Sequence, residues 1–331
     1  MRKRHASPGF VFRRLVKGVF FLVGPTATGK SELAAEVAPR CNAEIVSADA
    51  FQIYHGLDVL TAKPDAAALA RAPHHLIGVL PLTEELNAEK FRKLALNKID
   101  EIHSRGKFAI VVGGSGLYIK ALTHGLARLP AANPQLRVEL NQLSVDELRA
   151  RLMRLDPQAA DKIDIKNPRR LVRAIEIASV IPSEVEGSRR ENLKVTSRGS
   201  STSLRSAQND RLSANGVFVF RERDELYARI DQRVIAMFAS GVIDEVRALG
   251  EVGETAAQTI GLHHIRDLIA GKISEAECVA AIQQATRRYA KRQLTWFRRQ
   301  TSFEPLNLSS QGWAEAISGI SQRVCALCAV E

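Results

Sequence analysis

The chain has 331 residues, of which 45% are hydrophobic and 25% are charged. This composition can bury one large core or two smaller ones, so we expect a globular protein. No apolar run approaches the roughly 20 residues that a membrane-spanning helix needs, which excludes a transmembrane protein. The 47 lysines and arginines exceed the 36 acidic residues by 11. This excess indicates either a polyanionic partner or the background of a basic proteome.

The cysteines and the two ends of the chain say little about function. Four cysteines in 331 residues do not form a disulfide framework, so we expect a reducing compartment, the cytoplasm. Cys325 and Cys328 have the spacing of metal ligands, but no second Cys or His pair lies near them, and we interpret this end as a tail. Residues 1–17 carry six lysines and arginines and no acid. A transit peptide has this composition, but we favour a disordered basic extension.

The first motif is Gly-Pro-Thr-Ala-Thr-Gly-Lys-Ser, which follows the apolar run 19–23 and leads into a helical pattern at 32–37. Strand, glycine-bounded loop and helix in this order are typical of a P-loop, whose backbone N–H groups surround a phosphate. Lys30 would contact the far phosphate and Ser31 its Mg²⁺ ion. The loop alone does not distinguish ATP from another diphosphate. The predicted diphosphate-binding residues are Gly24, Pro25, Thr26, Ala27, Thr28, Gly29, Lys30 and Ser31.

Asp49 ends the next predicted strand, 44–49. Ligands gather at the carboxyl ends of parallel strands, so Asp49 is expected beside the P-loop, although a structural aspartate or a helix cap has the same pattern. A later strand, 108–112, leads into a second glycine turn at 113–116 and lacks the aspartate that ends a Walker B strand. Ordinary ATP hydrolysis is therefore disfavoured. Asp49 is the acid placed to act as a base.

The rest of the chain alternates between sheet and helical patterns. Periodicity predicts a strand at 75–80, a last strand at 217–220, and helices at 88–103, 145–155, 169–177, 224–240 and 274–300. We therefore predict an α/β fold, a P-loop NTPase-like parallel sheet flanked by helices, with a helical insertion domain and a helical C-terminal part. The expected parts are a basic extension (1–17), a first core part (18–125), the insertion domain (126–178), a low-complexity insert (179–216), a second core part (217–310) and a tail (311–331).

The last long predicted helix is strongly basic. Ser274 and Glu277 have the spacing of a capping box at its start. Ile282, Tyr289 and Trp296 repeat every seven residues, which predicts a buried stripe. Six lysines and arginines between residues 287 and 299, with no acid among them, cover its other faces. Such a surface is either simply solvated or binds phosphates of a nucleic acid, and we favour phosphate binding.

Several motifs in one order resemble the tRNA dimethylallyltransferases, also called tRNA isopentenyltransferases. The resemblance implies that the P-loop holds the diphosphate of dimethylallyl diphosphate, which would explain the missing Walker B aspartate. It also implies transfer of the five-carbon group to the exocyclic amine of the adenosine 3′ of the anticodon. The matching segments lie at residues 24–31, 47–54, 61–64, 73–76, 113–118, 167–171, 260–261 and 286–297.

This chemistry assigns roles to residues of the chain. Asp49 would accept the amine proton, and Lys30, Arg229 or Arg233 would stabilise the leaving diphosphate together with Mg²⁺ on Ser31. The resemblance places Ser115 beside the adenine, which must leave the anticodon-loop stack. The other residues expected to contact tRNA are Asp49, Ala50, Phe51, Gln52, Arg137, Arg169, Arg170, Leu171, Val172, Arg173, Gln258, Gly261, His263, Arg287, Arg288, Lys291 and Arg292.

The chain departs from the family pattern at a few positions. Ala50, Leu60 and the pair 262–263 replace the usual Ser, Gly and Tyr-Lys, and the stretch 180–211 has no counterpart. Two other hypotheses stay open. A P-loop small-molecule or nucleotide kinase would consume ATP, whereas a non-catalytic RNA-binding NTPase module would leave Asp49 without a task. We expect tRNA and dimethylallyl diphosphate as partners, no membrane, and a monomer.

Overall fold

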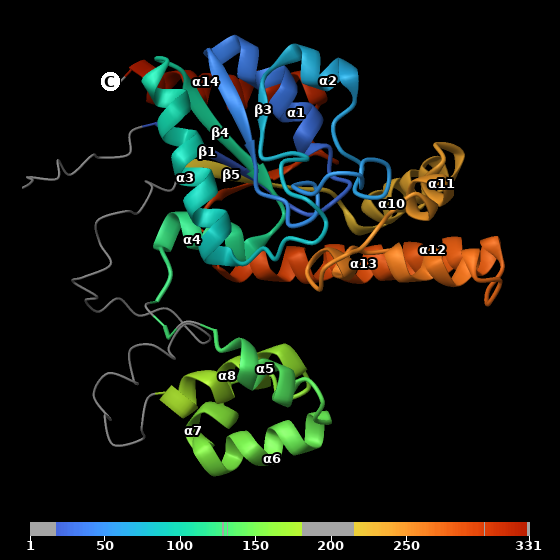
Figure 1. Cartoon of the computed structure of the whole chain (residues 1–331). Coiled ribbons are helices and arrows are strands. Elements are labelled where there is room, and N and C mark those ends of the chain that lie inside the picture. The colour runs from blue at the N-terminus through green and yellow to red at the C-terminus, as the bar shows by residue number, and fades with distance from the viewer. Residues whose placement is uncertain (1–17, 128, 131, 181–214, 301, 330–331) are drawn as a thin grey trace, which may run out of the picture. The chain divides into compact units, whose positions relative to one another are not determined.

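The computed structural model describes residues 18–127, 129–130, 132–180, 215–300 and 302–329. The chain divides into two compact units, which are described separately (Figure 1). The larger unit comprises Met1–Gly125 and Asn209–Glu331, and the smaller one comprises Leu126–Gln208. The predicted basic extension and most of the predicted low-complexity insert lie outside the described residues. Among the described residues, no helix has both the length and the apolar character to cross a membrane.

A six-stranded sheet forms the centre of the larger unit (Figure 1), with the order β3-β2-β4-β1-β5-β6 and parallel pairing throughout. Three of its strands are buried along their whole length. β1 and β4 are continuous apolar runs, as expected for strands covered on both faces, whereas β2 also buries Glu44. The fold class predicted from the sequence is confirmed. The strands are β1 (Val19–Val23), β2 (Ala43–Ser47), β3 (His74–His75), β4 (Phe108–Gly113), β5 (Asn215–Phe220) and β6 (Glu304–Asn307).

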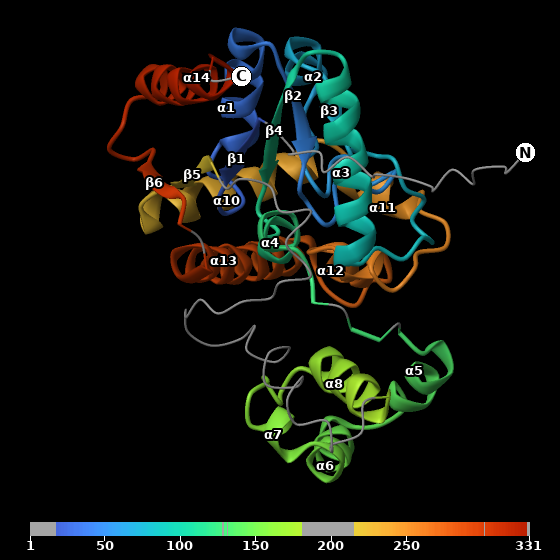
Figure 2. The same ribbon diagram turned by 90° about the vertical axis from the view of Figure 1, so that its left-hand side faces the viewer.

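Alternate residues of β1 face two different cores, as the twofold periodicity of a strand requires. Phe20 and Leu22 lie in the core under α1 (Lys30–Val37) and α14 (Trp313–Ala329), and Figure 2 shows these two helices on one side of the sheet. Phe21 lies in the opposite core. The helices that contribute to this opposite core are α3 (Ala88–Ser104), α4 (Gly116–His124), α10 (Arg223–Ala239), α11 (Val242–Arg247), α12 (Leu262–Ile269) and α13 (Glu275–Gln300).

Two predictions for the C-terminal part were wrong. The strand at 217–220 is not the last, because β6 pairs with it in parallel. The C-terminal stretch is not a tail, because α14 buries Ala316, Ile320 and Val324 at four-residue spacing against the sheet. The thiol of Cys325 on the same helix donates a hydrogen bond to Cys41 Sγ at 3.0 Å. The chain therefore returns to the first helix after the basic helix α13.

One predicted strand is shorter than expected. Only His74 and His75 of that region pair with β2, and the chain then turns at Leu76, whose φ is +62°. A non-glycine residue with positive φ ends regular strand geometry, so the apolar run up to residue 80 continues as loop. The short helix α2 (Ala66–Arg71) precedes this strand and was not predicted.

The smaller unit consists of helices in the part that the structure describes. Its core contains Leu140, Leu148, Leu152, Leu171 and Ile175. The side chains of Ser144 and Glu147 form a capping box that fixes the start of α6, a signal that the prediction of 145–155 from periodicity did not use. The helices are α5 (Pro134–Leu140), α6 (Val145–Leu155), α7 (Pro157–Ala160) and α8 (Pro168–Val180).

Candidate active site

The P-loop connects β1 to α1 at the carboxyl end of the sheet. Gly29 precedes α1 with φ of +93°, a conformation that glycine adopts without strain. A Cβ atom on Gly24 would lie 2.2 Å from the carbonyl oxygen of Val219 on β5, so only glycine fits there. The ammonium group of Lys30 donates to the Pro25 carbonyl oxygen at 3.0 Å, within the same loop. The loop therefore closes on itself at the edge of the sheet.

The electrostatics around Lys30 suit an anion. Burial lowers the pKa of Lys30 to about 8; the charge of Asp49 opposes this effect and that of Arg233 adds to it. Burial also lowers the pKa of Arg233. Bound phosphate oxygens would stabilise the protonated form of Lys30 and raise its pKa again. The cations of this site are thus held in surroundings that favour a negatively charged ligand.

Arginines that precede or lie on α10 bind the P-loop directly. Arg229 Nε donates to the Ala27 carbonyl oxygen at 2.9 Å. Arg233, one turn later, donates from Nη1 to Thr26 Oγ1 and from Nη2 to the Thr61 carbonyl oxygen, both at 3.0 Å. Both were predicted site residues. Arg221 was not, yet its Nε donates to the Thr28 carbonyl oxygen at 3.0 Å. It follows β5 directly, and its position in the sequence gives no periodic signal.

Asp49 lies just beyond β2 and faces the same pocket as the P-loop. Its Oδ1 atom accepts hydrogen bonds from the backbone N–H groups of Phe51 at 2.9 Å and Gln52 at 3.2 Å. The structural interpretation of Asp49, a carboxylate that caps the next turn, is therefore correct. The same bonds orient the carboxylate at the wall of the pocket, so the capping role and a role in catalysis are compatible.

The pocket has a volume of about 510 Å³ and combines two kinds of lining. Its lining includes charged and polar side chains as well as apolar ones, which suits a small ligand with an anionic head and a hydrocarbon tail. The charged and polar part includes Thr26, Lys30, Ser31, Asp49, Gln52, Arg229 and Arg233. The apolar part includes Ile45, Ala68, Ile77, Val112 and Ala236.

The second glycine turn, 113–116, packs against α13 through Gln293. Its side chain accepts from the Thr26 N–H at 3.0 Å and donates to the Gly114 carbonyl oxygen at 2.9 Å. A Cβ atom on Gly114 would lie only 2.3 Å from Gln293 Nε2. Gln293 thus joins the P-loop to the glycine turn. It also accepts the hydrogen bond of the Thr26 N–H group, which could otherwise donate to a phosphate. No sequence signal singled it out, because its two partners are remote in the chain.

Ser115 lies in the same turn, close to Asp49. Its hydroxyl oxygen accepts a hydrogen bond from the Ala50 N–H at 3.1 Å. This contact joins the end of β4 to the loop after β2 at the carboxyl edge of the sheet. Asp49, Ser115 and the P-loop, which are separate in the sequence, are therefore brought together as predicted.

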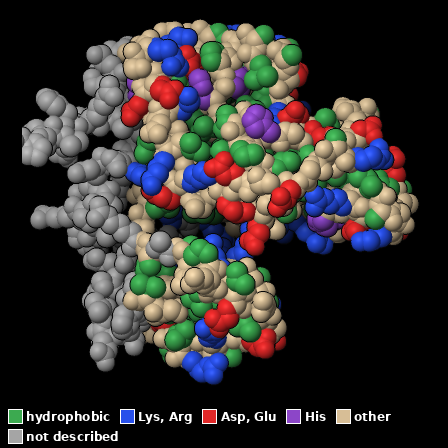
Figure 3. Space-filling view, viewed as in Figure 1, with side chains coloured by type: hydrophobic (Ala, Val, Ile, Leu, Met, Phe, Trp, Pro, Cys, Tyr) green, Lys and Arg blue, Asp and Glu red, His purple; other side chains and the backbone are tan. Residues whose placement is uncertain are grey.

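Not all cationic side chains of the basic helix α13 are available to bind phosphates, contrary to what the sequence had indicated. Arg287 forms a bidentate ion pair with Asp231 of α10 and also lies over the Tyr227 ring. Arg288 and Lys291 are exposed. Acidic side chains lie among the basic ones on the molecular face drawn in Figure 3. Among the expected tRNA contacts on α13, the exposed cations are therefore better placed than Arg287.

The expected tRNA contacts before α13 fall into two groups. Gln258 and His263 are exposed. Gly261 is buried at the start of α12 with φ of +97°, and a Cβ atom there would approach Leu60 and Ile282 at 3.1 and 3.3 Å. Gly261 is therefore required for packing against Leu60 and Ile282, and its predicted contact with tRNA stays a prediction.

The smaller unit shows a similar division. Leu171 and Val172 are buried in its core, so their side chains serve packing, and their predicted contact with tRNA stays a prediction for the backbone alone. Arg137 and Arg173 both pair with Glu176, an acid that is only 2% exposed and that the sequence did not single out. Burial alone would raise the pKa of Glu176, but the hydrogen bonds from both arginines lower it. Arg169 and Arg170 are exposed.

The fold is that of an α/β protein with a P-loop-like parallel sheet. Residues 52–300 match the family model described as IPP transferase, and the chain belongs to this family. A tRNA dimethylallyltransferase from Akkermansia muciniphila is 38% identical over 298 residues, which cover 90% of this chain and 96% of that protein. The tRNA dimethylallyltransferase 1 of Citrifermentans bemidjiense is 41% identical and covers 84% of this chain and 88% of its own length.

Solved structures show the same likeness. The full-length tRNA isopentenylpyrophosphate transferase from Bacillus halodurans is 31% identical, with a TM-score of 0.65, over 95% of this chain and 97% of that chain. A eukaryotic dimethylallyltransferase acting on tRNA has a TM-score of 0.72 over 92% of this chain and 77% of that chain. At 23% identity, the second comparison supports the fold alone.

Proposed function

We propose that this protein transfers the dimethylallyl group from dimethylallyl diphosphate to the exocyclic amine of the adenosine 3′ of the anticodon in tRNA. The observation that carries this proposal is the pocket that joins Asp49, the P-loop cations and an apolar wall. A non-catalytic nucleotide-binding module would use the P-loop but would leave Asp49 without a task. Membership of the IPP transferase family and the names of the relatives support the same reaction.

The reaction forms one bond and breaks one bond. The amine nitrogen of the adenine bonds to C1 of the dimethylallyl group, while the C1–O bond breaks and its electron pair leaves with the diphosphate. The nitrogen loses a proton, which Asp49 accepts. Backbone hydrogen bonds from Phe51 and Gln52 hold the Asp49 carboxylate in place for this transfer. Lys30, Arg229 and Arg233 stabilise the charge that gathers on the leaving diphosphate.

The donor set of the pocket fits Mg²⁺. The hydroxyl of Ser31 and the carboxylate of Asp49 both line the pocket, and oxygen is the ligand that Mg²⁺ prefers. Such ions are held by one or two protein groups together with phosphate oxygens and water, so no larger carboxylate cluster is required. Ser31 would hold the ion, which would neutralise part of the diphosphate charge.

The tRNA partner accounts for the exposed cations. An adenine in an anticodon loop is already partly unstacked and can turn into a pocket at modest cost. Ser115, Ala50 and Gln52 lie at the pocket or beside Asp49, where the flipped base would enter. Arg288 and Lys291 on α13 would bind backbone phosphates, and Arg169 and Arg170 would serve the same purpose in the smaller unit. We expect a monomer that acts on cytoplasmic tRNA.

The test uses purified protein, an anticodon stem-loop RNA and labelled dimethylallyl diphosphate with Mg²⁺, without ATP. We expect label to enter the RNA with wild-type protein and not when the target adenosine is replaced by guanosine. Phosphate transfer from labelled ATP, with no prenylation of the RNA, would instead support the kinase alternative. RNA binding with neither reaction would support a non-catalytic module.

A further inference from the structure

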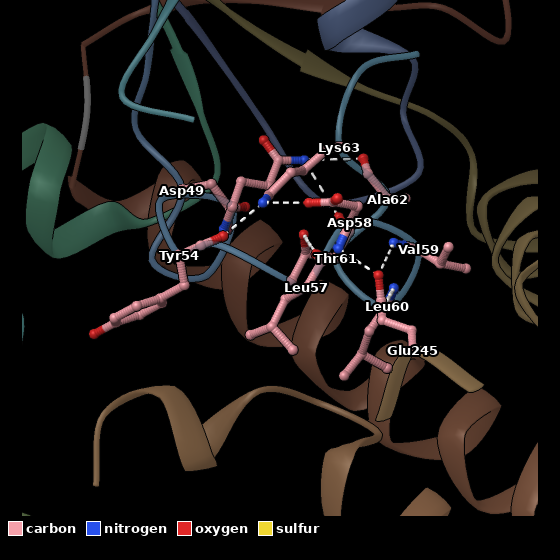
Figure 4. A network of polar contacts seen from close by, with 11 residues as sticks. Asp49, Tyr54, Leu57, Asp58, Val59, Leu60, Thr61, Ala62, Lys63 and Glu245 are labelled. Carbon is pink, nitrogen blue, oxygen red and sulfur yellow. Dashed lines mark hydrogen bonds and ion pairs between the residues drawn. The ribbon is translucent and has the colours of Figure 1, made fainter. Parts of the chain in front are cut away.

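Glu245 of α11 binds the backbone of a loop that is far away in the sequence. Its Oε1 atom accepts hydrogen bonds from the N–H groups of Asp58 at 2.6 Å and Val59 at 2.7 Å, and its Oε2 atom accepts from Leu60 at 2.8 Å. Figure 4 shows this carboxylate against the loop of residues 57–63, on the opposite side from Asp49. Hydrogen bonds from N–H groups to a carboxylate are among the stronger ones in proteins.

The next residues of the same loop hold two side chains of the pocket. The Thr61 carbonyl oxygen accepts from Arg233 Nη2 at 3.0 Å and from Gln52 Nε2 at 3.3 Å. The Ala62 carbonyl oxygen accepts from Gln52 Nε2 at 3.0 Å. Arg233 in turn binds Thr26 of the P-loop. The loop of residues 57–63 therefore lies between Glu245 and the cation that faces the diphosphate site.

The backbone of this loop needs support. Ala62 has φ of +46°, in the left-handed region that alanine rarely adopts. Such conformations persist when surrounding contacts fix them. The loop is fixed internally by bonds from the Ala62 N–H to the Val59 carbonyl oxygen at 3.0 Å and from the Lys63 N–H to the Asp58 carbonyl oxygen at 2.9 Å. It is fixed from outside by Glu245 and by the bond from Lys63 Nζ to the Tyr54 carbonyl oxygen. Removing the Glu245 carboxylate would take away three of the bonds that orient the loop before the carbonyl groups of Thr61 and Ala62.

We infer that Glu245 is a positioning residue of the diphosphate site, one that holds Arg233 and Gln52 in place through the loop of residues 57–63. The packing of α11 itself does not explain Glu245, because Val242 and Val246 bury that helix against the core. This inference rests on the proposed function, since Arg233 matters through the diphosphate that it contacts. Glu245 touches neither substrate and acts only through the loop.

The test compares Glu245→Ala, Glu245→Gln and Asp244→Ala. Asp244 is the neighbouring acid on α11; it is exposed and pairs with Arg247, so its variant removes the same charge without touching the loop. The measurements are calorimetric binding of inorganic diphosphate with Mg²⁺, and kcat and KM for both substrates. Displacements of about 1 Å in a site cost up to roughly 10²-fold.

We expect Glu245→Ala to weaken diphosphate binding and raise KM for dimethylallyl diphosphate by about 10- to 100-fold, with a smaller rise in KM for tRNA through Gln52. Glu245→Gln should lie between, because its one carbonyl oxygen still accepts from part of the loop and preserves the shape of the side chain. Asp244→Ala should match the wild type. Wild-type diphosphate binding by a folded Glu245→Gln and Glu245→Ala would overturn the inference, as would an equal loss with Asp244→Ala.

A double-substitution cycle separates positioning from general damage. If Glu245 acts through Arg233, Glu245→Ala should weaken diphosphate binding much less in an Arg233→Ala background than in the wild type. Full additivity would overturn the inference. Amide hydrogen exchange of Asp58, Val59 and Leu60 should be faster in Glu245→Ala than in the wild type, and unchanged in Asp244→Ala. If the wild type fails to prenylate RNA while Glu245→Ala still weakens diphosphate binding, the proposed function fails and the positioning role stands.

Discussion

Gln293 provides a quantitative test of how the site is assembled. Its side chain is 6% exposed and binds two backbone groups that belong to different loops, Thr26 and Gly114. The substitution Gln293→Ala leaves a buried carbonyl oxygen and a part-buried N–H group without this partner. A buried polar group that loses its partner costs about 1–3 kcal/mol. The two groups together give a range of about 2–6 kcal/mol. Since water can reach the Thr26 side from the pocket, we expect a loss in the lower half of this range, about 3 kcal/mol.

The measurement is urea unfolding followed by tryptophan fluorescence. Both tryptophans of the chain, Trp296 and Trp313, belong to the larger unit, so the signal reports that unit. Gln284→Ala is the matched control, because Gln284 lies on the same helix and is exposed; we expect a change within about 0.5 kcal/mol. If Gln293→Ala also stays within that limit, the bridge between the P-loop and the glycine turn does not stabilise the fold, and the reasoning fails.

Three further predictions concern catalysis and binding. Asp49→Ala should lower turnover by roughly 10² to 10⁴ with diphosphate and tRNA affinity nearly unchanged, and near-normal turnover would reject Asp49 as the base. Burial lowers the pKa of Lys30 to about 8, so this side chain loses its proton as the pH rises through 8. The affinity for inorganic diphosphate should therefore fall between pH 7 and 9 more steeply in the wild type than in Lys30→Arg. Parallel pH profiles of the two proteins would contradict this prediction. Replacing the exposed Arg288 and Lys291 by Ala should reduce the slope of log affinity for tRNA against log salt concentration by about 0.9 for each phosphate that is no longer bound. The control Arg40→Ala, on the opposite side of the sheet, should leave this slope unchanged. An unaltered slope in the double variant would mean that this face of α13 is only solvated.

The departures from the family pattern are accommodated by packing or by backbone contacts. Ala50 binds Ser115 through its N–H group, a bond that the change of side chain leaves intact. Leu60 is 4% exposed, packs near Gly261 and Ile282, and donates its N–H to Glu245. Leu262 lies in the core of the larger unit. These substitutions therefore alter the interior beside the pocket and leave its charged groups unchanged.

Local signals in the sequence were sufficient to predict the strands and the loop that carry the site residues. The apolar run of β1, the glycines of the P-loop and the strand before Asp49 predict the relative order of these parts, because strand burial and loop geometry depend on adjacent residues. The capping box at Ser274 and Glu277 predicted the start of α13 for the same reason. The resemblance of the motifs added the chemistry.

Other features were decided by the tertiary structure alone. Periodicity did not reveal that Asp231 neutralises Arg287, that Gln293 bridges Thr26 and Gly114, or that α14 covers α1. Each of these contacts joins residues that are far apart in the chain, and Glu245 lies 185 residues from Leu60. Hydrophobic periodicity says which face of an element is buried, but the partner on that face depends on where the chain returns. The sequence by itself therefore determined the fold class, the P-loop and the position of Asp49, and only the folded chain decided which cations remain free and which residues hold the pocket in shape.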